Sequence, residues 1–284
     1  MSILFAVICG AIQGAAEFLP ISSSGHLALF QQLFMKDPSS ADLLAFNVLL
    51  HLGTLFAVFI VYGRDILRLI PAFFRAAYRM VRGRFVLSEA DPDERMAIMV
   101  IIGTLPMALA KAVDDRVELL SSSVCAVGVI LIVNAAVLFA ADRIRTGYAD
   151  CASASPATAL IVGLAQCLAV LPGLSRSGSS VTAGRACGYD REFAVRFSFI
   201  LSVPAILGAA VFELPEAWKG GIPSADLPAC AAGAFTALVC GVAAIKLLTA
   251  IARKRGFTFF SFYCLIAGSA AVALGSAGIV FPIF

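Results

Sequence analysis

Charged residues are scarce in this chain. Asp, Glu, Lys and Arg make up only 14% of its 284 residues, whereas they make up about 25% of a typical soluble domain. Hydrophobic residues make up 61%, and the mean hydropathy is +0.95. The shortage of charge argues against a soluble protein and predicts an integral membrane protein.

Other absences exclude further classes of protein and of site. The apolar stretches lack the alternation, in segments of about ten residues, that marks a transmembrane β-barrel. No basic residue precedes the apolar run at 1–19, and Glu17 interrupts its end, so we do not expect a signal peptide. The eight cysteines are scattered without metal-ligand spacing, so they are expected to be small core residues rather than a metal site.

Six apolar stretches are long enough to cross a bilayer core as helices, since a core of roughly 30 Å needs about 20 helical residues. They lie at 43–62, 96–113, 120–141, 193–212, 227–249 and 257–281. Because unpaired backbone groups cannot face lipid, all six are predicted to be α-helices. The sequence therefore predicts an all-α, polytopic membrane protein that forms one membrane domain over 1–284.

Two further regions are apolar but interrupted. Residues 3–19 are followed by Pro20 and three serines, and only about ten helical residues come next before a charged, proline-containing segment. Residues 156–171 and 179–187 repeat this shape around Pro172 and Gly173. Each region is predicted to be a broken, re-entrant helical pair, which is tolerated where the backbone lines a cavity in the protein.

The two broken pairs are related by an internal repeat. A shift of 153 residues aligns Gly10 with Gly163 and Gln13 with Gln166, and it aligns the serine-glycine loop at 22–25 with that at 175–178. We therefore predict one repeat over about 1–141 and a second over about 155–284. Three spans separate the pairs, so they enter from opposite faces and the repeat is inverted. In such folds, substrate sites form where the repeats meet.

Positive charge is unevenly distributed between the predicted connections. Arginine and lysine gather at 64–95, 143–145, 185–196 and 253–255, whereas the opposite face holds only Lys36, Lys111, Arg116 and Lys219. The positive-inside rule then places the first set in the cytoplasm, and the N-terminus, the loop at 37–42 and the C-terminus outside. The basic stretch at 68–84 also contains aromatic residues and has helical character, so anionic lipid is its expected partner rather than nucleic acid.

Four segments resemble the undecaprenyl-diphosphate phosphatase family of the bacitracin-resistance type. They are QGAAEFLPISSSGH at 13–26, FNVLLHLGTLFAV at 46–58, LPGLSRSGSSVTAG at 171–184 and RFSFILSVPAILGA at 196–209. The resemblance implies a membrane enzyme that hydrolyses undecaprenyl diphosphate to undecaprenyl phosphate and phosphate with a divalent cation. It also implies recycling of the lipid carrier for cell-wall synthesis, bacitracin resistance, and a location in the bacterial inner membrane.

The resemblance also implies roles for individual residues. Gln13 and Glu17 match a Glu/Gln-xxx-Glu signature, Ser23 and His26 match a serine and a histidine that family members use, and Ser175 and Arg176 match a serine and an arginine. Many members have glutamate where this chain has Gln13, which leaves Glu17 as the one carboxylate of the expected pocket.

The residue types suit a diphosphate without reference to the family. Arg176 offers a fork of donors that holds two phosphate oxygens, and Mg²⁺ or Ca²⁺ on Glu17, with Gln13 as a further candidate ligand, would supply more positive charge. Either Glu17 or His26 is expected to act as the base, and His26, Ser23 or a water is expected to attack phosphorus. His51 is expected to be a packing residue, with a place in the lining of the cavity as the alternative. The remaining substrate contacts are expected from hydroxyls and loop amides at Ser22, Ser24, Gly25, Gly173, Ser175, Ser177, Gly178 and Ser180.

Two other function classes fit the same pocket. A polyprenyl-phosphate transporter would need the same groups, and inverted repeats are common in transporters. A lipid-phosphate receptor would leave Glu17 and His26 without a chemical role. We expect the site to open to the periplasmic side, because the first broken pair enters from outside. The sequence does not decide between a monomer and a homodimer.

Overall fold

A computed structural model describes residues 1–35, 41–144, 147–220, 223–254, 256–281 and 283 of the chain. Lys36, Arg145, Arg255 and most of the loop predicted at 37–42 lie outside these residues. The α-helices are α1 (Ile3–Phe18), α2 (Ser23–Phe34), α3 (Ala41–Val81), α4 (Pro92–Thr104), α5 (Asp114–Ser121), α6 (Val124–Ala141), α7 (Pro156–Leu168), α8 (Arg176–Ala186), α9 (Arg191–Gly220), α10 (Leu227–Lys254) and α11 (Thr258–Ala277). Short 3₁₀ helices are η1 (Leu87–Glu89), η2 (Leu105–Val113) and η3 (Ser224–Asp226). The described residues contain no β-strand, so the all-α prediction is confirmed.

Five of the helices are long and apolar enough to cross a membrane, counting only the described part of the chain. They belong to α3, α6, α9, the run from η3 into α10, and α11, and they match five of the six predicted spans. The sixth prediction, 96–113, does not form one continuous α-helix. The α-helix α4 ends at Thr104 and the chain continues as the 3₁₀ helix η2, because Pro106 has no N–H to donate and its ring crowds the preceding turn.

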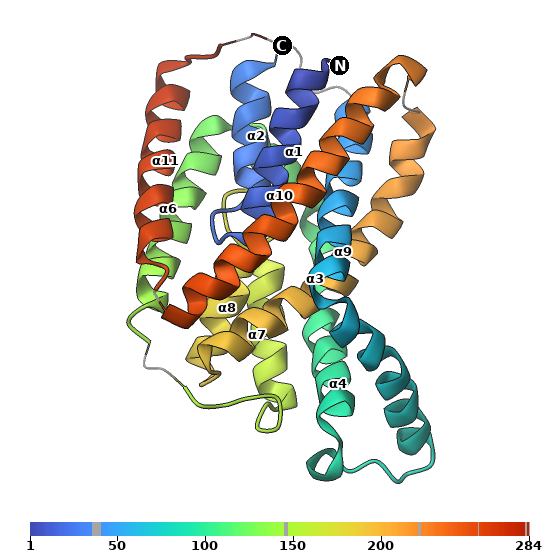
Figure 1. Cartoon of the computed structure of the whole chain (residues 1–284). Helices are drawn as coiled ribbons and strands as arrows, with labels where there is room; N and C mark the ends of the chain where they lie inside the picture. Colours follow the sequence, from blue (N-terminus) through green and yellow to red (C-terminus); the bar gives the residue numbers. More distant parts are fainter. Residues whose placement is uncertain (36–40, 145–146, 221–222, 255, 282, 284) are drawn as a thin grey trace.

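The helix α3 is much longer than a membrane span. Its 41 residues correspond to about 61 Å at the α-helical rise, roughly twice the thickness of a bilayer core. Its second half forms a hairpin with α4 that projects from the bundle at the end opposite to the two termini (Figure 1). Arg79 Nη1 donates to Glu94 Oε2 at 2.8 Å, and Glu94 is 3% exposed, so this ion pair fixes the hairpin.

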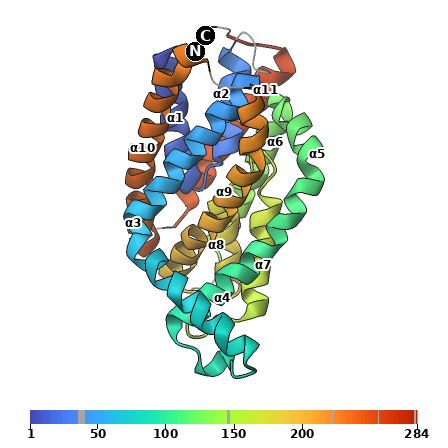
Figure 2. The same cartoon turned by 90° about the vertical axis from the view of Figure 1, so that its right-hand side faces the viewer.

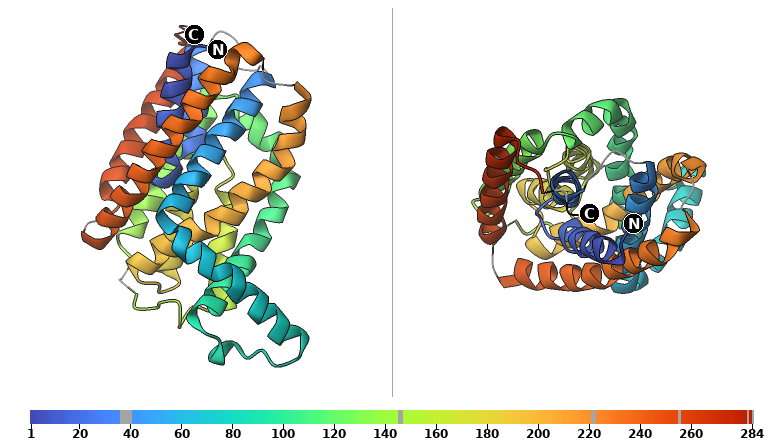
Figure 3. Two further views of the ribbon diagram at one scale, coloured as in Figure 1. Left: turned by 45° about the vertical axis from the view of Figure 1, so that its right-hand side comes forward. Right: turned by 90° about the horizontal axis from the view of Figure 1, so that it is seen from above.

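The two broken pairs enter the bundle from opposite ends. The pair α1 and α2 descends from the end that carries both termini, whereas α7 and α8 lie in the other half, and the two connecting loops meet near mid-height (Figure 1). Seen from above, α10 and α11 run along the outside while α1 and α2 lie further in (Figure 3). The helices α3 and α9 pack on one another on another side of the molecule (Figure 2).

Two glycines related by the 153-residue shift have the same packing role. Gly10 lets α1 approach the backbone of α10, where a Cβ would overlap the carbonyl oxygen of Gly233. Gly163 lets α7 approach α4 in the same way, against the carbonyl oxygen of Gly103. Close backbone contact of this kind is typical of membrane helices. The shared role is what an internal repeat predicts, while the inverted symmetry itself stays a prediction.

Candidate functional site

Serine side chains cap the helices that follow both central loops. Ser22 Oγ accepts a hydrogen bond from Gly25 N at 3.2 Å and begins α2, and Ser175 Oγ accepts one from Gly178 N at 3.1 Å and begins α8. Serine is a preferred N-cap because its oxygen satisfies an amide that the first turn leaves unpaired. The caps make Ser23 and Arg176 the first residues of α2 and α8.

The two loops are also joined to each other. Gly173 N donates to Ser22 Oγ at 3.2 Å, and a Cβ on Gly25 would lie 2.7 Å from Gly173 Cα. Gly173 has φ +106°, a conformation that glycine adopts at little cost. Ser22 has φ 73°, which is strained for a residue with a side chain, and its cap and inter-loop hydrogen bonds hold it there. This junction therefore fixes the relative positions of Ser23 and Arg176.

Glu17 lies at the centre of the contacts made by these two residues. Arg176 Nη2 donates to Glu17 Oε1, while Ser23 Oγ donates to Glu17 Oε2 at 2.5 Å. Gln13 Nε2 donates to the same Oε2 at 3.0 Å from one turn earlier in α1. Glu17 is 6% exposed, so its charge is balanced by Arg176 rather than by solvent.

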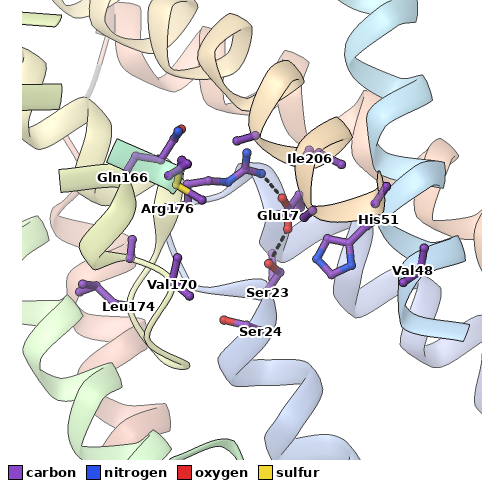
Figure 4. A pocket seen from close by; sticks show the side chains of 16 residues that line it. Glu17, Ser23, Ser24, Val48, His51, Gln166, Val170, Leu174, Arg176 and Ile206 are labelled. Atoms are coloured by element: carbon purple, nitrogen blue, oxygen red, sulfur yellow. Dashed lines mark hydrogen bonds and ion pairs between the residues drawn. The ribbon is translucent and has the colours of Figure 1, made fainter. Parts of the chain in front are cut away.

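A cavity of about 170 Å³ opens beside this ion pair. Its polar lining consists of Glu17, Ser23, Ser24, His51, Gln166 and Arg176 (Figure 4). The apolar lining comes from α3, η2, the loop after α7, and α9, and includes Val48, Met107, Val170, Leu174 and Ile206. Drug-sized ligands occupy pockets of about 300–1,000 Å³. This cavity therefore suits a small polar group and not a long hydrocarbon chain.

The structure brings only part of the predicted site together. Glu17, Ser23, Ser24 and Arg176 line the cavity, as a site built from both loops requires. The other predicted substrate contacts do not line it and instead cap helices, join the loops or, for Ser180, contact Ser198 on α9; they are Ser22, Gly25, Gly173, Ser175, Ser177, Gly178 and Ser180. They shape the site without facing the cavity.

His26 is likewise absent from the residues that line the cavity. Its Nδ1 is bonded to Ser22 O at 2.8 Å and its Nε2 to Tyr263 Oη at 2.9 Å. The imidazole also stacks on the Tyr263 ring, with centroids 5.5 Å apart. The structure thus places His26 between α2 and α11, away from Glu17 and Arg176.

His51 and Gln166 line the cavity. Gln166 was not predicted as a site residue, and for His51 this position was the alternative to the expected packing role. The ring of His51 lies beside Glu17, close enough for an electrostatic interaction (Figure 4). An ionisable side chain in the middle of a predicted span is itself a signal of function, and that signal was available for His51. For Gln166 the signal was its alignment with Gln13 in the repeat.

The described residues contain no group of three or more His, Cys, Asp or Glu side chains that could hold a metal ion. Gln13 Oε1 is nevertheless buried without a hydrogen-bond partner, one turn from Glu17. Mg²⁺ is commonly held by one or two protein oxygens together with substrate phosphates. The residues present therefore fit a cation that binds mainly through its substrate, with Glu17 and Gln13 Oε1 as the protein ligands.

Sequence comparisons identify relatives along almost the whole chain. The family model described as bacitracin resistance protein BacA matches residues 6–270. A protein of Methanobrevibacter smithii named undecaprenyl-diphosphatase is 40% identical over 271 residues, covering 94% of this chain and 96% of that protein. Proteins with the same name from Desulfatibacillum aliphaticivorans and a Mycobacterium species are 39% and 35% identical, and they cover 93% and 99% of this chain and 95% and 99% of their own lengths.

Proposed function

The chain belongs to the bacitracin resistance protein BacA family, and from this membership and the cavity we propose that it hydrolyses undecaprenyl diphosphate to undecaprenyl phosphate and phosphate. The observation that carries the proposal is the contact of Arg176 and Ser23 with one carboxylate, Glu17, at the wall of the cavity. In this proposal Arg176 binds the anion, Ser23 is the hydroxyl nucleophile and Glu17 is the base, and their contacts keep the three within reach of one another.

The N-termini of two helices lie at the cavity and make it suited to bind phosphate. Ser23 begins α2 and Arg176 begins α8, so the N-terminal ends of both helices lie at the cavity wall. Helix N-termini carry partial positive charge and unpaired amides, and both favour phosphate. An arginine at the first position of a helix adds positive charge where it is already present, which is reasonable where an anion is to be bound.

We propose that Ser23 is the nucleophile and Glu17 its base. A terminal phosphate that accepts hydrogen bonds from Arg176 competes with Glu17 for the guanidinium and leaves the carboxylate able to take a proton. Ser23 Oγ then bonds to the terminal phosphorus while the bond from that phosphorus to the bridging oxygen breaks, and the prenyl monophosphate leaves. Glu17 passes the proton that it took from Ser23 to the leaving prenyl phosphate and is ionised again. It then deprotonates a water that hydrolyses the phosphoserine, and that proton returns to Ser23 Oγ as phosphate leaves.

The structure supports His51 rather than His26 as a histidine that exchanges a proton with a bound phosphate. His51 lines the cavity, whereas both ring nitrogens of His26 are bonded elsewhere. A catalytic acid or base has to lie within hydrogen-bond reach of the group that it serves. In this proposal His26 supports the α2–α11 contact.

A divalent cation, Mg²⁺ or Ca²⁺, is part of the proposal. A diphosphate brings more negative charge than Arg176 alone can neutralise, and the cation would supply the balance and polarise the phosphate oxygens. Glu17 and Gln13 Oε1 would hold it. Arg176 remains the residue that orients the terminal phosphate.

The experiment that tests the proposal is phosphate release from undecaprenyl or farnesyl diphosphate by the purified full-length chain in detergent. We expect turnover in Mg²⁺ or Ca²⁺, loss of turnover in excess EDTA, and recovery when the cation is restored. Full activity in EDTA would contradict the proposed requirement for a divalent cation. A protein that binds the lipid but releases no phosphate would contradict hydrolysis and favour transport or simple binding.

The cellular role follows from this reaction. Undecaprenyl phosphate produced at a cytoplasmic membrane would re-enter cell-wall synthesis, and removal of the diphosphate form would confer bacitracin resistance. The chain would take up the lipid from the membrane through a gap between helices, because the cavity has no room for the tail. We also propose that the head group enters from the periplasmic face, because the positive-inside rule predicts that the outer ends of α1 and α2 lie on that side.

Access is testable at Ser24, which is exposed and lines the cavity. In a background from which the native cysteines have been removed, Ser24→Cys should react with a membrane-impermeant thiol reagent added from outside, and a prenyl diphosphate should protect it. Reaction only from the cytoplasmic side would reverse the proposed access. Substrate-dependent reaction from both sides would favour alternating access and therefore a transporter.

A further inference from the structure

Gln166 is a buried amide without a partner. It is 1% exposed in the last turns of α7 and lines the cavity, yet neither Oε1 nor Nε2 has a hydrogen-bond partner among the described residues. Leaving a buried polar group unpaired costs about 1–3 kcal/mol. An apolar side chain at this position would avoid the cost, so the glutamine is not explained by packing.

The repeat shows what Gln166 lacks. Its counterpart Gln13 donates from Nε2 to Glu17 Oε2 at 3.0 Å. The same 153-residue shift replaces Glu17 by Val170, which lines the cavity beside Gln166. The second half of the site therefore keeps the donor but has no carboxylate to accept from it. An acceptor for Gln166 has to come with the ligand.

The position of Gln166 indicates which part of the ligand it meets. In the view of Figure 4, Arg176 lies between Gln166 and the group formed by Glu17 and Ser23. The cavity that Gln166 lines also has the apolar residues Val170, Leu174 and Met107 in its wall. If the terminal phosphate lies against Ser23, the phosphate that bears the prenyl chain lies on the far side of Arg176, toward Gln166.

We propose that Gln166 Nε2 donates a hydrogen bond to the prenyl-bearing phosphate and so makes the site selective for a diphosphate over a monophosphate. This inference rests on the proposed hydrolysis for the orientation of the ligand, because it assumes that the terminal phosphate is the one attacked. Gln13 and Gln166 then have different tasks. Gln13 orients the base Glu17, and Gln166 binds the phosphate that bears the prenyl chain.

The test compares Gln166→Met with Gln31→Met in the full-length chain. Methionine keeps the shape of glutamine and removes its amide. Gln31 is a matched control because it is also buried but donates to Asn47 Oδ1 at 3.0 Å, and it does not line the cavity. The probes are farnesyl diphosphate for turnover, and a farnesyl methylenediphosphonate and a farnesyl phosphonate, which are not hydrolysed, for binding measured as a shift in Tm.

For Gln166→Met we expect the Tm without ligand to stay the same or rise, because no partner is lost. The KM for farnesyl diphosphate should rise about tenfold to hundredfold, as expected for loss of one hydrogen bond to a charged group. The diphosphonate should raise the Tm of the wild-type chain more than the monophosphonate does, and this difference should disappear in the variant. Gln31→Met should lower the Tm and leave the KM unchanged.

Each other outcome decides between the two proposals. A lower Tm with unchanged KM in Gln166→Met would show a structural amide and overturn the inference while leaving hydrolysis intact. Absence of wild-type turnover would overturn hydrolysis, and the phosphonate comparison would still test Gln166. If Gln166→Met does not fold, Gln166→Glu serves instead, since its carboxylate would repel the phosphate and weaken diphosphonate binding more than monophosphonate binding.

Discussion

Replacing Ser23 with alanine is expected to reduce kcat/KM for prenyl diphosphate hydrolysis by on the order of 10³-fold or more, because it removes the attacking oxygen. The Ser23 hydroxyl donates to Glu17 Oε2 at 2.5 Å, which is the geometry of a nucleophile that gives its proton to a base. Glu17 keeps its contacts with Arg176 and Gln13 in the variant, so the fold should be retained. The measurement is phosphate release together with a thermal melt of the same preparation.

Ser24→Ala provides the comparison for this prediction. Ser24 lies next in the chain and lines the same cavity, but its hydroxyl contacts Ser22 Oγ at 3.4 Å rather than Glu17, and its expected role is to donate to a phosphate oxygen. Loss of one neutral hydrogen bond should cost less than about tenfold in kcat/KM. Similar small losses in both variants would contradict Ser23 as the nucleophile and favour a water held by Glu17.

Much of the fold is predictable because the bilayer restricts the choice of structure. Apolar length alone identified five of the spans, and interrupted apolar sequence identified both broken pairs. The prediction of a single α-helix over 96–113 was wrong, because hydropathy carries no information about the backbone hydrogen bond that Pro106 cannot make. The helical character of the basic stretch after the first long span was predicted, but not that it continues the span as one helix, α3, whose second half is held by ion pairs with the start of α4.

The site was predictable in its centre and less so at its edges. Glu17 and Arg176 are charges in apolar sequence, and the repeat brought their loops together, so their proximity followed from the sequence. Hydroxyls were harder to assign, because serine serves equally as a phosphate donor and as a helix cap, and Ser22 and Ser175 are caps. The choice between two histidines depended on the direction of each ring, which spacing does not specify.

The arginine at position 176 should not be replaceable by lysine. Arg176 Nη2 contacts Glu17, and Nη1 lies 3.4 Å from Ser202 O, so the guanidinium spans from the base toward α9. Lysine keeps the charge but loses the planar fork that holds two oxygens at once. Arg176→Lys should therefore lower kcat/KM by about 10²- to 10³-fold, corresponding to two hydrogen bonds of charged groups.

Arg196→Lys is the matched control for this last prediction. Arg196 Nη2 pairs with Asp65 Oδ1 at 3.0 Å, its side chain is 44% exposed, and it does not line the cavity. Exposed ion pairs contribute little and tolerate a flexible ammonium, so Arg196→Lys should retain nearly full activity. Both variants keep the net charge of the chain, so a difference in turnover between them at equal Tm would reflect the bidentate contact of Arg176 with phosphate. Equal activities would instead mean that residue 176 contributes only a charge to balance Glu17, and the terminal phosphate would then have to be oriented by the amides at the starts of α2 and α8.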